Sequence, residues 1–364
     1  MFFSPTLFNY FARHFIFYVL SIFFIIIAVI YLLDVVEFLR RGASKESISI
    51  GLILEMAILK APSIGHKILP FAVLFGSMMA FTKIVKSREL VATHAAGFTI
   101  WQIIIPSICV VLIIGTFWIS VINPVSSVLT AKFETLENSV LRNQNSALSL
   151  SPGGLWIREQ NANGHSVLHA RAISDDGEML SNITIFIFES ENAFSARIDA
   201  KHATLKAGFW DLKDIVVITD DGVPQKKPFS RHLTQLTKEN LQDSFASPHA
   251  MSFWELPEFI GVLEKAGFSA VRHRLHWHSL LASPLLLCAM VLIAATFSLR
   301  ASARISSRKW MLGGLFFGFF LYFMTDLVFA LGLSGRIPEV FAAWTPVIVT
   351  TLIGITSLLY LEDA

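Results

Sequence analysis

Residues 83–97 (KIVKSRELVATHAAG) combine charged residues with the pattern of a short helix. Ser87 is a residue type that caps helices, Glu89 follows in the first turn, where the helix dipole favours an anion, and Gly97 is suited to end the helix. Such a helix offers a carboxylate and an apolar ridge to a partner, which is docking chemistry rather than catalysis. An ordinary basic loop is the alternative. The residues expected to contact a partner are Arg88, Glu89, Leu90, Val91 and His94.

A basic cluster follows the first apolar stretch of the chain. Its members are Arg40, Arg41, Lys45, Lys60, Lys67 and Lys132. A guanidinium group binds phosphate through two parallel hydrogen bonds, so the cluster is a candidate site for an anionic lipid. The principal residues of that site would be Arg40, Arg41 and Lys132. The alternative is that these side chains anchor helix ends at the level of the lipid head groups.

Two carboxylates lie in or beside apolar stretches, where a charge is costly and usually faces the interior of a bundle. Asp34 ends the first stretch, and Asp326 lies inside the fifth. We expect Asp34 to be interfacial and Asp326 to hydrogen-bond to another helix, with a role in a transport pathway as the alternative. The fifth stretch is rich in phenylalanine, and Phe316 and Phe320 are predicted to face lipid, a protein core or an apolar cavity for acyl chains.

The sequence lacks the common motifs of catalytic and metal sites. It has no G-x-x-x-x-G-K-[ST] loop for ATP, no H-E-x-x-H and no C-x-x-C pair. His165 and His169 have a spacing that suits metal binding on a helix, but their segment is predicted to be a strand, so we expect no metal site. Cys109 and Cys288 lie in apolar stretches, and residues 124–267 have no cysteine for a disulfide. If the protein does chemical work, the energy for that work must come from elsewhere.

The composition is typical of a membrane protein. Of 364 residues, 54% are hydrophobic and 15% are charged, and the mean hydropathy is +0.61. Soluble domains have about 25% charged residues, so a soluble globular domain, a disordered chain and a nucleic-acid-binding protein are all disfavoured. The net charge of +2 hides an uneven distribution, because residues 124–267 carry 13 basic and 18 acidic residues and the rest carries 16 and 9.

Six apolar stretches are long enough for helices that cross a hydrocarbon layer of about 30 Å. Three precede the polar middle of the chain and three follow it. The second is predicted to be tilted or broken near Pro62 and Pro70. The stretches are residues 15–33, 57–82, 98–123, 279–299, 310–333 and 340–361. We therefore predict an α-helical membrane protein of six spans with an inserted domain.

Basic residues in short loops predict the orientation of the spans, because such loops stay in the cytoplasm. Arg13, Lys83, Lys86 and the basic residues of 300–309 lie on the same side as the two ends of the chain. Both termini are thus predicted to be cytoplasmic and the inserted domain external. The basic cluster lies on the external side against this trend, which an anionic lipid ligand would explain.

The inserted domain has the pattern of short strands. Residues 183–189 (ITIFIFE) and 210–213 alternate apolar and polar side chains. Turn-forming pairs such as Asn163 with Gly164 and Asp221 with Gly222 separate the runs. Many short strands at this spacing predict a sandwich, barrel or jelly roll.

Helices are predicted on both sides of the strands. Leu129, Phe133 and Leu136 have helical spacing, which extends the third span as a stalk. Residues 252–255 fit a capping box at the start of a second helix, which would end at Gly267. The apolar stripe of that helix is Leu256, Phe259, Ile260 and Leu263. The predicted organisation is residues 1–123 with three spans, 124–267 with the β domain and 268–364 with three spans.

Three segments carry a resemblance to a known family. They are residues 87–102 (SRELVATHAAGFTIWQ), 153–159 (GGLWIRE) and 250–267 (AMSFWELPEFIGVLEKAG). In these segments, and in its layout over nearly the whole chain, the sequence resembles the LptF/LptG permeases of the lipopolysaccharide exporter, an ATP-binding-cassette system of Gram-negative inner membranes. Residues 34–41 (DVVEFLRR) are more similar to the LptG branch than to the LptF branch.

The resemblance implies partners and a transport route. It implies a periplasmic jelly roll, a heterodimer with an LptF-like permease, an LptB-like ATPase dimer that binds ATP and Mg²⁺, and an LptC-like bitopic protein. Lipopolysaccharide would enter a V-shaped cavity from the outer leaflet, with the first and fifth spans at its lateral gates, and pass to a periplasmic bridge towards the outer membrane. This chain itself would be non-catalytic and bind no cofactor.

The resemblance also implies residue roles. Glu89 would contact the ATPase, and Arg40 and Arg41 would face the lipid phosphates. Asp34 departs from the family pattern, in which a relative has Lys, and this leaves the phosphate site on Arg40, Arg41 and Lys132.

Functions of other classes are alternatives to lipopolysaccharide export. A membrane-anchored scaffold or sensor with an external β domain needs no docking helix, and co-purification of an ATPase separates the two. A secondary transporter or membrane enzyme is disfavoured by the few intramembrane carboxylates. Within the family, the LptF-like half of the permease is the alternative to the LptG-like half.

Overall fold

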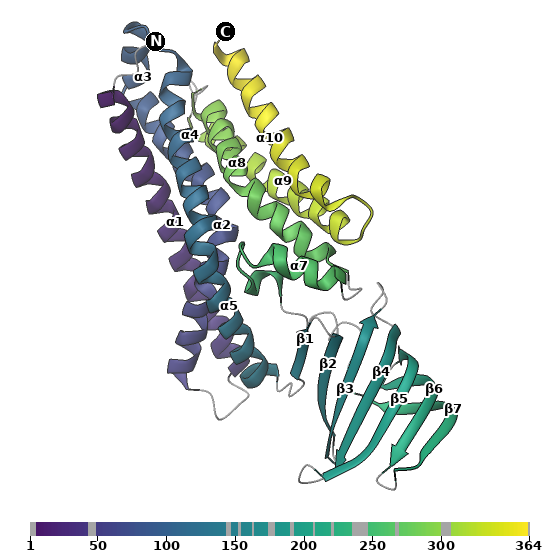
Figure 1. Ribbon diagram of the computed structural model, residues 1–364. Helices are drawn as coiled ribbons and strands as arrows, with labels where there is room; N and C mark the ends of the chain where they lie inside the picture. The colour runs from purple at the N-terminus through teal and green to yellow at the C-terminus, as the bar shows by residue number, and fades with distance from the viewer. Residues whose placement is uncertain are drawn as a thin grey trace. The chain divides into compact units, whose positions relative to one another are not determined.

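The computed structural model describes residues 5–42, 49–142, 147–151, 154–161, 164–173, 179–189, 193–206, 208–219, 222–234, 247–265, 269–299 and 307–362. These residues form two compact units, one helical and one containing all the described strands (Figure 1). The helical unit combines the described parts of Met1–Phe133, Ser252–Trp254 and Arg274–Ala364. The β unit combines those of Glu134–Met251 and Glu255–His273. The middle of the chain is thus inserted between two halves of one helical unit.

Six apolar helices in the described chain are long enough to cross a membrane, which confirms the predicted spans. They extend beyond the apolar stretches seen in the sequence, and the second continues without interruption through Pro62 and Pro70. In such a span neighbouring helices compensate for the hydrogen bonds that each proline removes. The helices are α1 (Pro5–Gly42), α2 (Ile50–Lys86), α4 (Ile100–Phe117) with α5 (Asn123–Leu136), α8 (Val271–Leu299), α9 (Ser307–Leu333) and α10 (Glu339–Glu362).

The third span changes its helical type part-way along. The π-helix η1 (Trp118–Ile122) joins α4 to α5, and the π-helix η2 (Glu137–Arg142) follows α5. The predicted stalk is therefore helical. Asn123 stands at the junction of η1 and α5, and its side-chain Oδ1 accepts a 2.7 Å hydrogen bond from the backbone N–H of Phe253. This bond ties the segment before α7 (Leu256–Lys265) to the third span within the helical unit.

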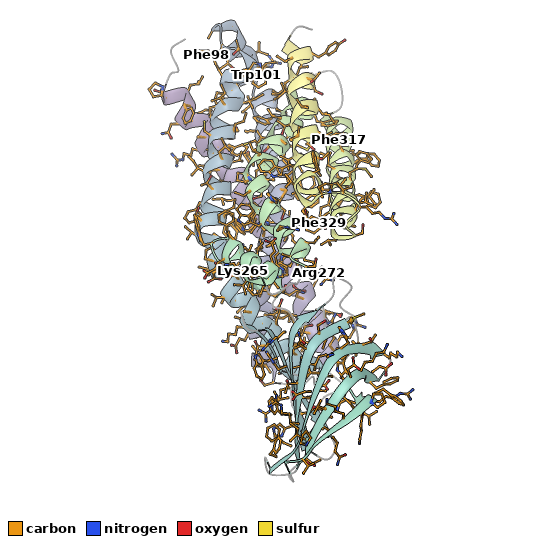
Figure 2. All side chains as sticks on the ribbon, turned by 45° about the vertical axis from the view of Figure 1, so that its right-hand side comes forward. Phe98, Trp101, Lys265, Arg272, Phe317 and Phe329 are labelled. Atoms are coloured by element: carbon orange, nitrogen blue, oxygen red, sulfur yellow. The ribbon has the colours of Figure 1, made fainter. Side chains whose placement is uncertain are left out.

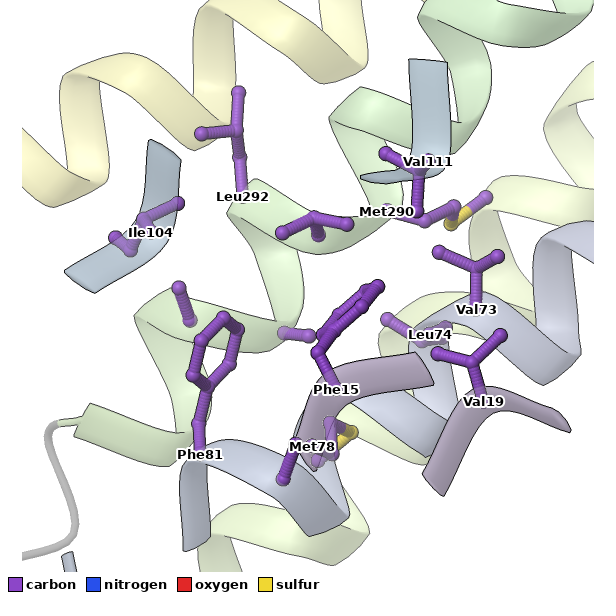
Figure 3. Packing of buried hydrophobic residues seen from close by; sticks show 14 of the residues in the cluster. Phe15, Val19, Val73, Leu74, Met78, Phe81, Ile104, Val111, Met290 and Leu292 are labelled. Carbon is purple, nitrogen blue, oxygen red and sulfur yellow. The ribbon is translucent and has the colours of Figure 1, made fainter. Parts of the chain in front are cut away.

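The core of the helical unit brings α1, α2, α4 and α8 together (Figure 3). Phe15 and Val19 of α1 are almost fully buried among side chains such as Leu74 of α2 and Leu292 of α8. Gly76 of α2 permits the closest approach, because a Cβ built there would lie 2.6 Å from the Val19 Cα. The first two spans therefore pack backbone to backbone at this level.

Figure 1 places the start of α1, the end of α10 and the short helix α3 (Glu89–Ala95) at one end of the helical unit. Phe98 and Trp101, which follow α3, lie at that end too (Figure 2). Arg40 and Arg41 lie at the opposite end of α1, and Lys60 lies in the half of α2 that is farther from α3. The unit thus has a docking end and a basic end.

The β unit contains one antiparallel sheet of seven strands. Its strands are adjacent in chain order, so each pairs with the next. The prediction of an inserted all-β domain is confirmed. The strands are β1 (Ala147–Ser151), β2 (Gly154–Asn161), β3 (Gly164–Ile173), β4 (Met179–Glu189), β5 (Ala193–Lys206), β6 (Phe209–Thr219) and β7 (Pro224–Leu233).

The sheet curls so that its last strand reaches its early strands. His232 of β7 lies 3.4 Å from the hydroxyl of Ser166 on β3, and the hydroxyl of Thr234 donates to the buried Glu159 carboxylate of β2. The concave side is apolar, with Trp210 fully buried. The short strands predicted from the sequence, with side chains that alternate between two faces, are therefore present as one curled sheet in chain order.

The helix α7 begins at Leu256, three residues later than the capping box predicts. Ser252 therefore precedes the helix rather than capping it. The apolar stripe is present, since Leu256, Ile260 and Leu263 are buried. Gly267, predicted to end this helix, lies outside the described residues.

Candidate functional site

The docking end is built around the turn between α2 and α3. Ser87 caps the end of α2 rather than the start of α3, since its hydroxyl donates to the Lys83 carbonyl at 2.9 Å. Arg88 then adopts a φ of 61°, which is uncommon for a residue with a Cβ and turns the chain sharply. The predicted N-cap role of Ser87 is therefore wrong, because the backbone reverses at Arg88 and leaves Ser87 in the last turn of the preceding helix.

The helix α3 is short but closed at its end. Gly97 has a φ of 83°, and the N–H of Phe98 donates to the Thr93 carbonyl at 3.1 Å, which is the long bond of a Schellman motif. The next span starts at once, and the N–H of Thr99 donates to the Gln102 side chain at 3.0 Å. The predicted end at Gly97 is confirmed. These closing bonds hold a helix of less than two turns in one place between two spans.

The side chains of α3 divide into an inner and an outer set. Leu90 packs against the core of the helical unit, whereas Val91 is 67% exposed. Glu89 is partly exposed and accepts a 3.3 Å hydrogen bond from the Tyr10 hydroxyl of α1. Arg88 is exposed, and the side chain of His94 lies outside the described residues. The predicted ridge is therefore narrower than the sequence indicates, because Leu90 faces the core.

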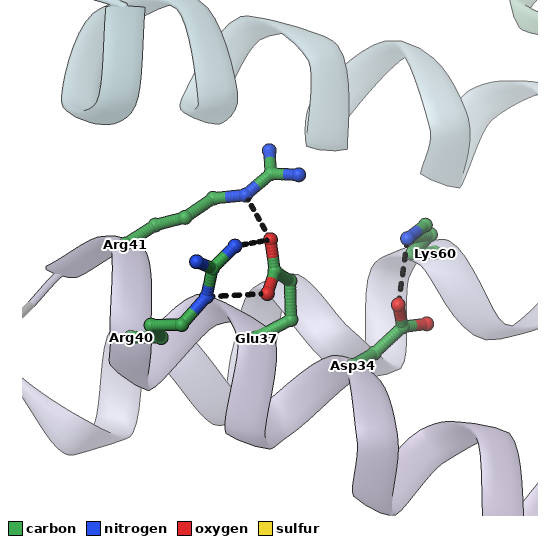
Figure 4. Close-up of polar contacts among 5 residues, drawn as sticks. All are labelled: Asp34, Glu37, Arg40, Arg41 and Lys60. Atoms are coloured by element: carbon green, nitrogen blue, oxygen red, sulfur yellow. Dashed lines mark hydrogen bonds and ion pairs between the residues drawn. The ribbon is translucent and has the colours of Figure 1, made fainter.

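The two arginines of the basic cluster share one carboxylate (Figure 4). Arg40 holds Glu37 through two 2.9 Å hydrogen bonds, and Arg41 Nε donates to the same carboxylate at 2.7 Å. Two positive charges and one negative charge leave this trio with one positive charge. Both guanidinium groups stay at least half exposed, so they remain accessible to an anion.

The lysines of the basic cluster differ in their partners. Lys60 pairs with Asp34 at 2.7 Å, and Lys132 pairs with Glu55 at 2.8 Å. Lys67 is exposed and has no carboxylate partner among the described residues. Lys45 lies outside the described residues. The cations of the cluster are evident in the sequence, but the acids that neutralise most of them were not predicted.

The helix α9 presents an aromatic face to its surroundings. Phe316 is 75% exposed and Phe320 is 47% exposed, whereas Phe317 packs against the core beside Phe297. Asp326 is also exposed and makes no hydrogen bond to another helix within the described part of the chain. The expected helix-to-helix bond of Asp326 is therefore not formed, because this residue lies on the flank of α9 that its own chain leaves uncovered.

Comparison with known proteins decides the family. The model of the lipopolysaccharide export system permease LptF/LptG matches residues 9–360. The chain belongs to the LptF/LptG family. A curated relative, the lipopolysaccharide export system permease protein LptG of Haemophilus influenzae, is 23% identical over 293 residues, covering 76% of this chain and 77% of the relative. LptG of Escherichia coli K12 is 23% identical over 311 residues, covering 79% and 80%.

As an LptF/LptG permease, the chain is a multi-pass inner-membrane protein of lipopolysaccharide export and a non-catalytic subunit. Among the described residues, no group of three or more His, Cys, Asp and Glu side chains is arranged to hold a metal ion.

Some residues of this permease were missed from the sequence for different reasons. Glu37 lies three and four residues before Arg40 and Arg41, a spacing that pairs charges on a helix, so a signal was present. Glu55 and Tyr10 meet Lys132 and Glu89 from distant parts of the chain. No local pattern could have predicted those two contacts.

Proposed function

We propose that this chain is an LptG-like permease subunit of an ATP-driven exporter. The exporter takes lipopolysaccharide from the outer leaflet of the inner membrane and passes it to a periplasmic protein bridge towards the outer membrane. The observation that carries the proposal is α3, a closed helix between two spans that exposes Val91 and presents Glu89. ATP and Mg²⁺ are bound by an LptB-like partner, which docks on this helix.

The orientation follows from charge. The start of α1, the end of α10 and α3 share one end of the helical unit, and the loops at that end are rich in lysine and arginine. Short basic loops remain in the cytoplasm, so this end faces the ATPase and the inserted β domain is periplasmic.

The least covered spans indicate where membrane partners bind. The apolar windows of α1 and α9 are 11% and 17% buried, whereas those of α2 and α8 are each 67% buried. A span that its own chain leaves exposed must be covered by lipid, substrate or another protein. We assign these two faces to an LptF-like permease, to the transmembrane helix of an LptC-like protein and to the lipid cavity, where Phe316 and Phe320 contact acyl chains.

Purification of the tagged chain in mild detergent tests this proposal. We expect an ATPase, a second permease of the same family and lipopolysaccharide to co-purify with it. A Val91→Asp variant places a charge on the exposed side of α3 and should release the ATPase while keeping the second permease. Recovery of the chain without an ATPase or a second permease would favour the membrane-anchored scaffold instead.

A further inference from the structure

Lys67 is unlike the other described cations of the basic cluster. Arg40 and Arg41 share Glu37, and the remaining two described lysines each have a carboxylate of their own. Lys67 lies inside the second span, is exposed and has no such partner in the described part of the chain. An ammonium group in a span is costly without a counter-charge, so Lys67 needs a ligand or a partner.

The contacts between α2 and α9 indicate which part of α9 lies at the level of Lys67. Gly314 of α9 lies against Met78 of α2, and Gly318 lies against Leu74. One turn further along, the rings of Tyr322 and Phe71 are 5.2 Å apart. Each step of four residues forward on α9 therefore matches three or four residues back on α2, as in two antiparallel helices.

The next step in this series brings Asp326 to the level of Lys67. Asp326 is one turn beyond Tyr322, and Lys67 is one turn before Phe71. Both side chains are exposed, and within the described residues they make no ion pair with each other or with any other group. The series therefore sets two opposite charges at one level of α2 and α9, one turn from the contact between the Phe71 and Tyr322 rings.

The contact between α2 and α9 limits what can reach both charges at once. Because α2 and α9 touch one turn away, a further helix of about 10 Å diameter does not fit between them at this level. A polar head group is smaller than a helix. Its anionic group would pair with Lys67, and Asp326 would accept a hydrogen bond from a donor on the same molecule.

We propose that Lys67 and Asp326 form a binding site for the head group of a phosphorylated glycolipid. The ammonium of Lys67 binds a phosphate, and the Asp326 carboxylate accepts a hydrogen bond from a sugar hydroxyl or amide. The rings of Phe71, Phe319 and Tyr322 form the apolar floor on which the sugar and the first carbons of the acyl chains rest. This site rests on the proposed function and names the residues of this chain that select its substrate.

The test measures equilibrium binding of lipid A, with and without its two phosphates, to the purified detergent complex. Lys67→Leu should weaken binding of the phosphorylated lipid about tenfold or more and leave the dephosphorylated lipid unchanged. Asp326→Leu should weaken the binding of both lipids by about threefold to tenfold. Lys67→Arg should retain binding, which separates loss of the charge from loss of the fold, and Lys265→Leu on α7 is the matched control.

The double variant Lys67→Leu with Asp326→Leu separates a ligand site from an ion pair between the two residues. A ligand site predicts that the double variant binds phosphorylated lipid no better than Lys67→Leu. Binding close to that of the unsubstituted chain in the double variant, or in Lys67→Leu alone, would overturn the site. Failure of the unsubstituted complex to bind either lipid would instead contradict the proposed function itself.

Discussion

Asp34 Oδ1 accepts a 2.7 Å hydrogen bond from Lys60 Nζ, and this ion pair joins α1 to α2 (Figure 4). The Lys60 ammonium also lies 5.3 Å from the centre of the Phe38 ring. Asp34 is 14% exposed, so its charge is largely removed from solvent. Asp34 therefore serves as the counter-charge of Lys60, which gives the unusual acid at this position a structural role.

Removal of Asp34 should destabilise the helical unit. Asp34→Leu leaves the Lys60 ammonium partly buried without a partner, and we expect a loss of about 1–3 kcal/mol in the free energy of unfolding. Adding Lys60→Leu should recover most of that loss, because both charges are then gone. Thermal unfolding of the purified complex, compared among the unsubstituted chain, Asp34→Leu and the double variant, measures these changes. A double variant as unstable as Asp34→Leu would contradict this account.

The approach of α1 to α2 should depend on the absence of a side chain at Gly76. A Cβ at this position would lie 2.6 Å from a backbone atom of Val19, so Gly76→Ala must push the two helices apart. We expect a destabilisation of about 1–3 kcal/mol. Gly261 of α7 has open space around its Cα, so Gly261→Ala is the control. Equal unfolding temperatures for the two variants would show that the helices are not in this contact.

Features of this chain that depend on local composition are evident in its sequence, and features that depend on distant contacts are not. Hydropathy depends on local composition, and it identified six spans and the strands of the inserted domain. The role of Ser87 could not be read locally, because it depends on the left-handed conformation of Arg88. The inward position of Leu90 depends on the core that surrounds α3.

The basic cluster shows the same limit at the level of charge. Its cations are evident in the sequence, but Lys132 and Glu55 are far apart along the chain and meet only in the fold. Lys67 and Asp326 likewise lie at the same level of α2 and α9. This follows from side-chain contacts between the two helices and not from any motif. Local patterns therefore predict the elements, and tertiary contacts decide which charges remain available.

Glu37 should compete with an anionic ligand for the two arginines. Glu37→Gln removes the carboxylate that both guanidinium groups hold, so more positive charge faces an incoming phosphate. We expect photo-crosslinking of lipopolysaccharide at Val36 to rise about twofold to tenfold, and to fall when Arg40 and Arg41 are both changed to Asp. Glu55→Gln is the matched control. Crosslinking that stays the same in all of these variants would show that Arg40 and Arg41 do not contact the lipid.

The curled sheet should loosen at acidic pH through His232. Burial lowers the pKa of His232 below its ordinary value of 6.5, so the folded domain binds a proton less readily than the unfolded chain. The contribution of neutral His232 to the free energy of unfolding is therefore complete above about pH 6.5. It is lost as the pH falls below that value. Hydrogen exchange of β3 and β7 at about pH 7.5 and 5.5 should reveal this loss. In His232→Gln the loss should shrink, whereas His202→Gln, at an exposed position of β5, should keep it.

ATP-dependent transfer of lipopolysaccharide by the reconstituted complex tests the central claim most directly. Glu89→Ala removes the acid that α3 offers to the ATPase, and we expect transfer to fall about tenfold or more with the permease still folded. Tyr10→Phe removes only the neighbouring hydroxyl and should keep transfer near the level of the unsubstituted chain. Normal ATP-dependent transfer in Glu89→Ala would contradict the docking role of α3, and absence of transfer from the unsubstituted complex would contradict the proposed function.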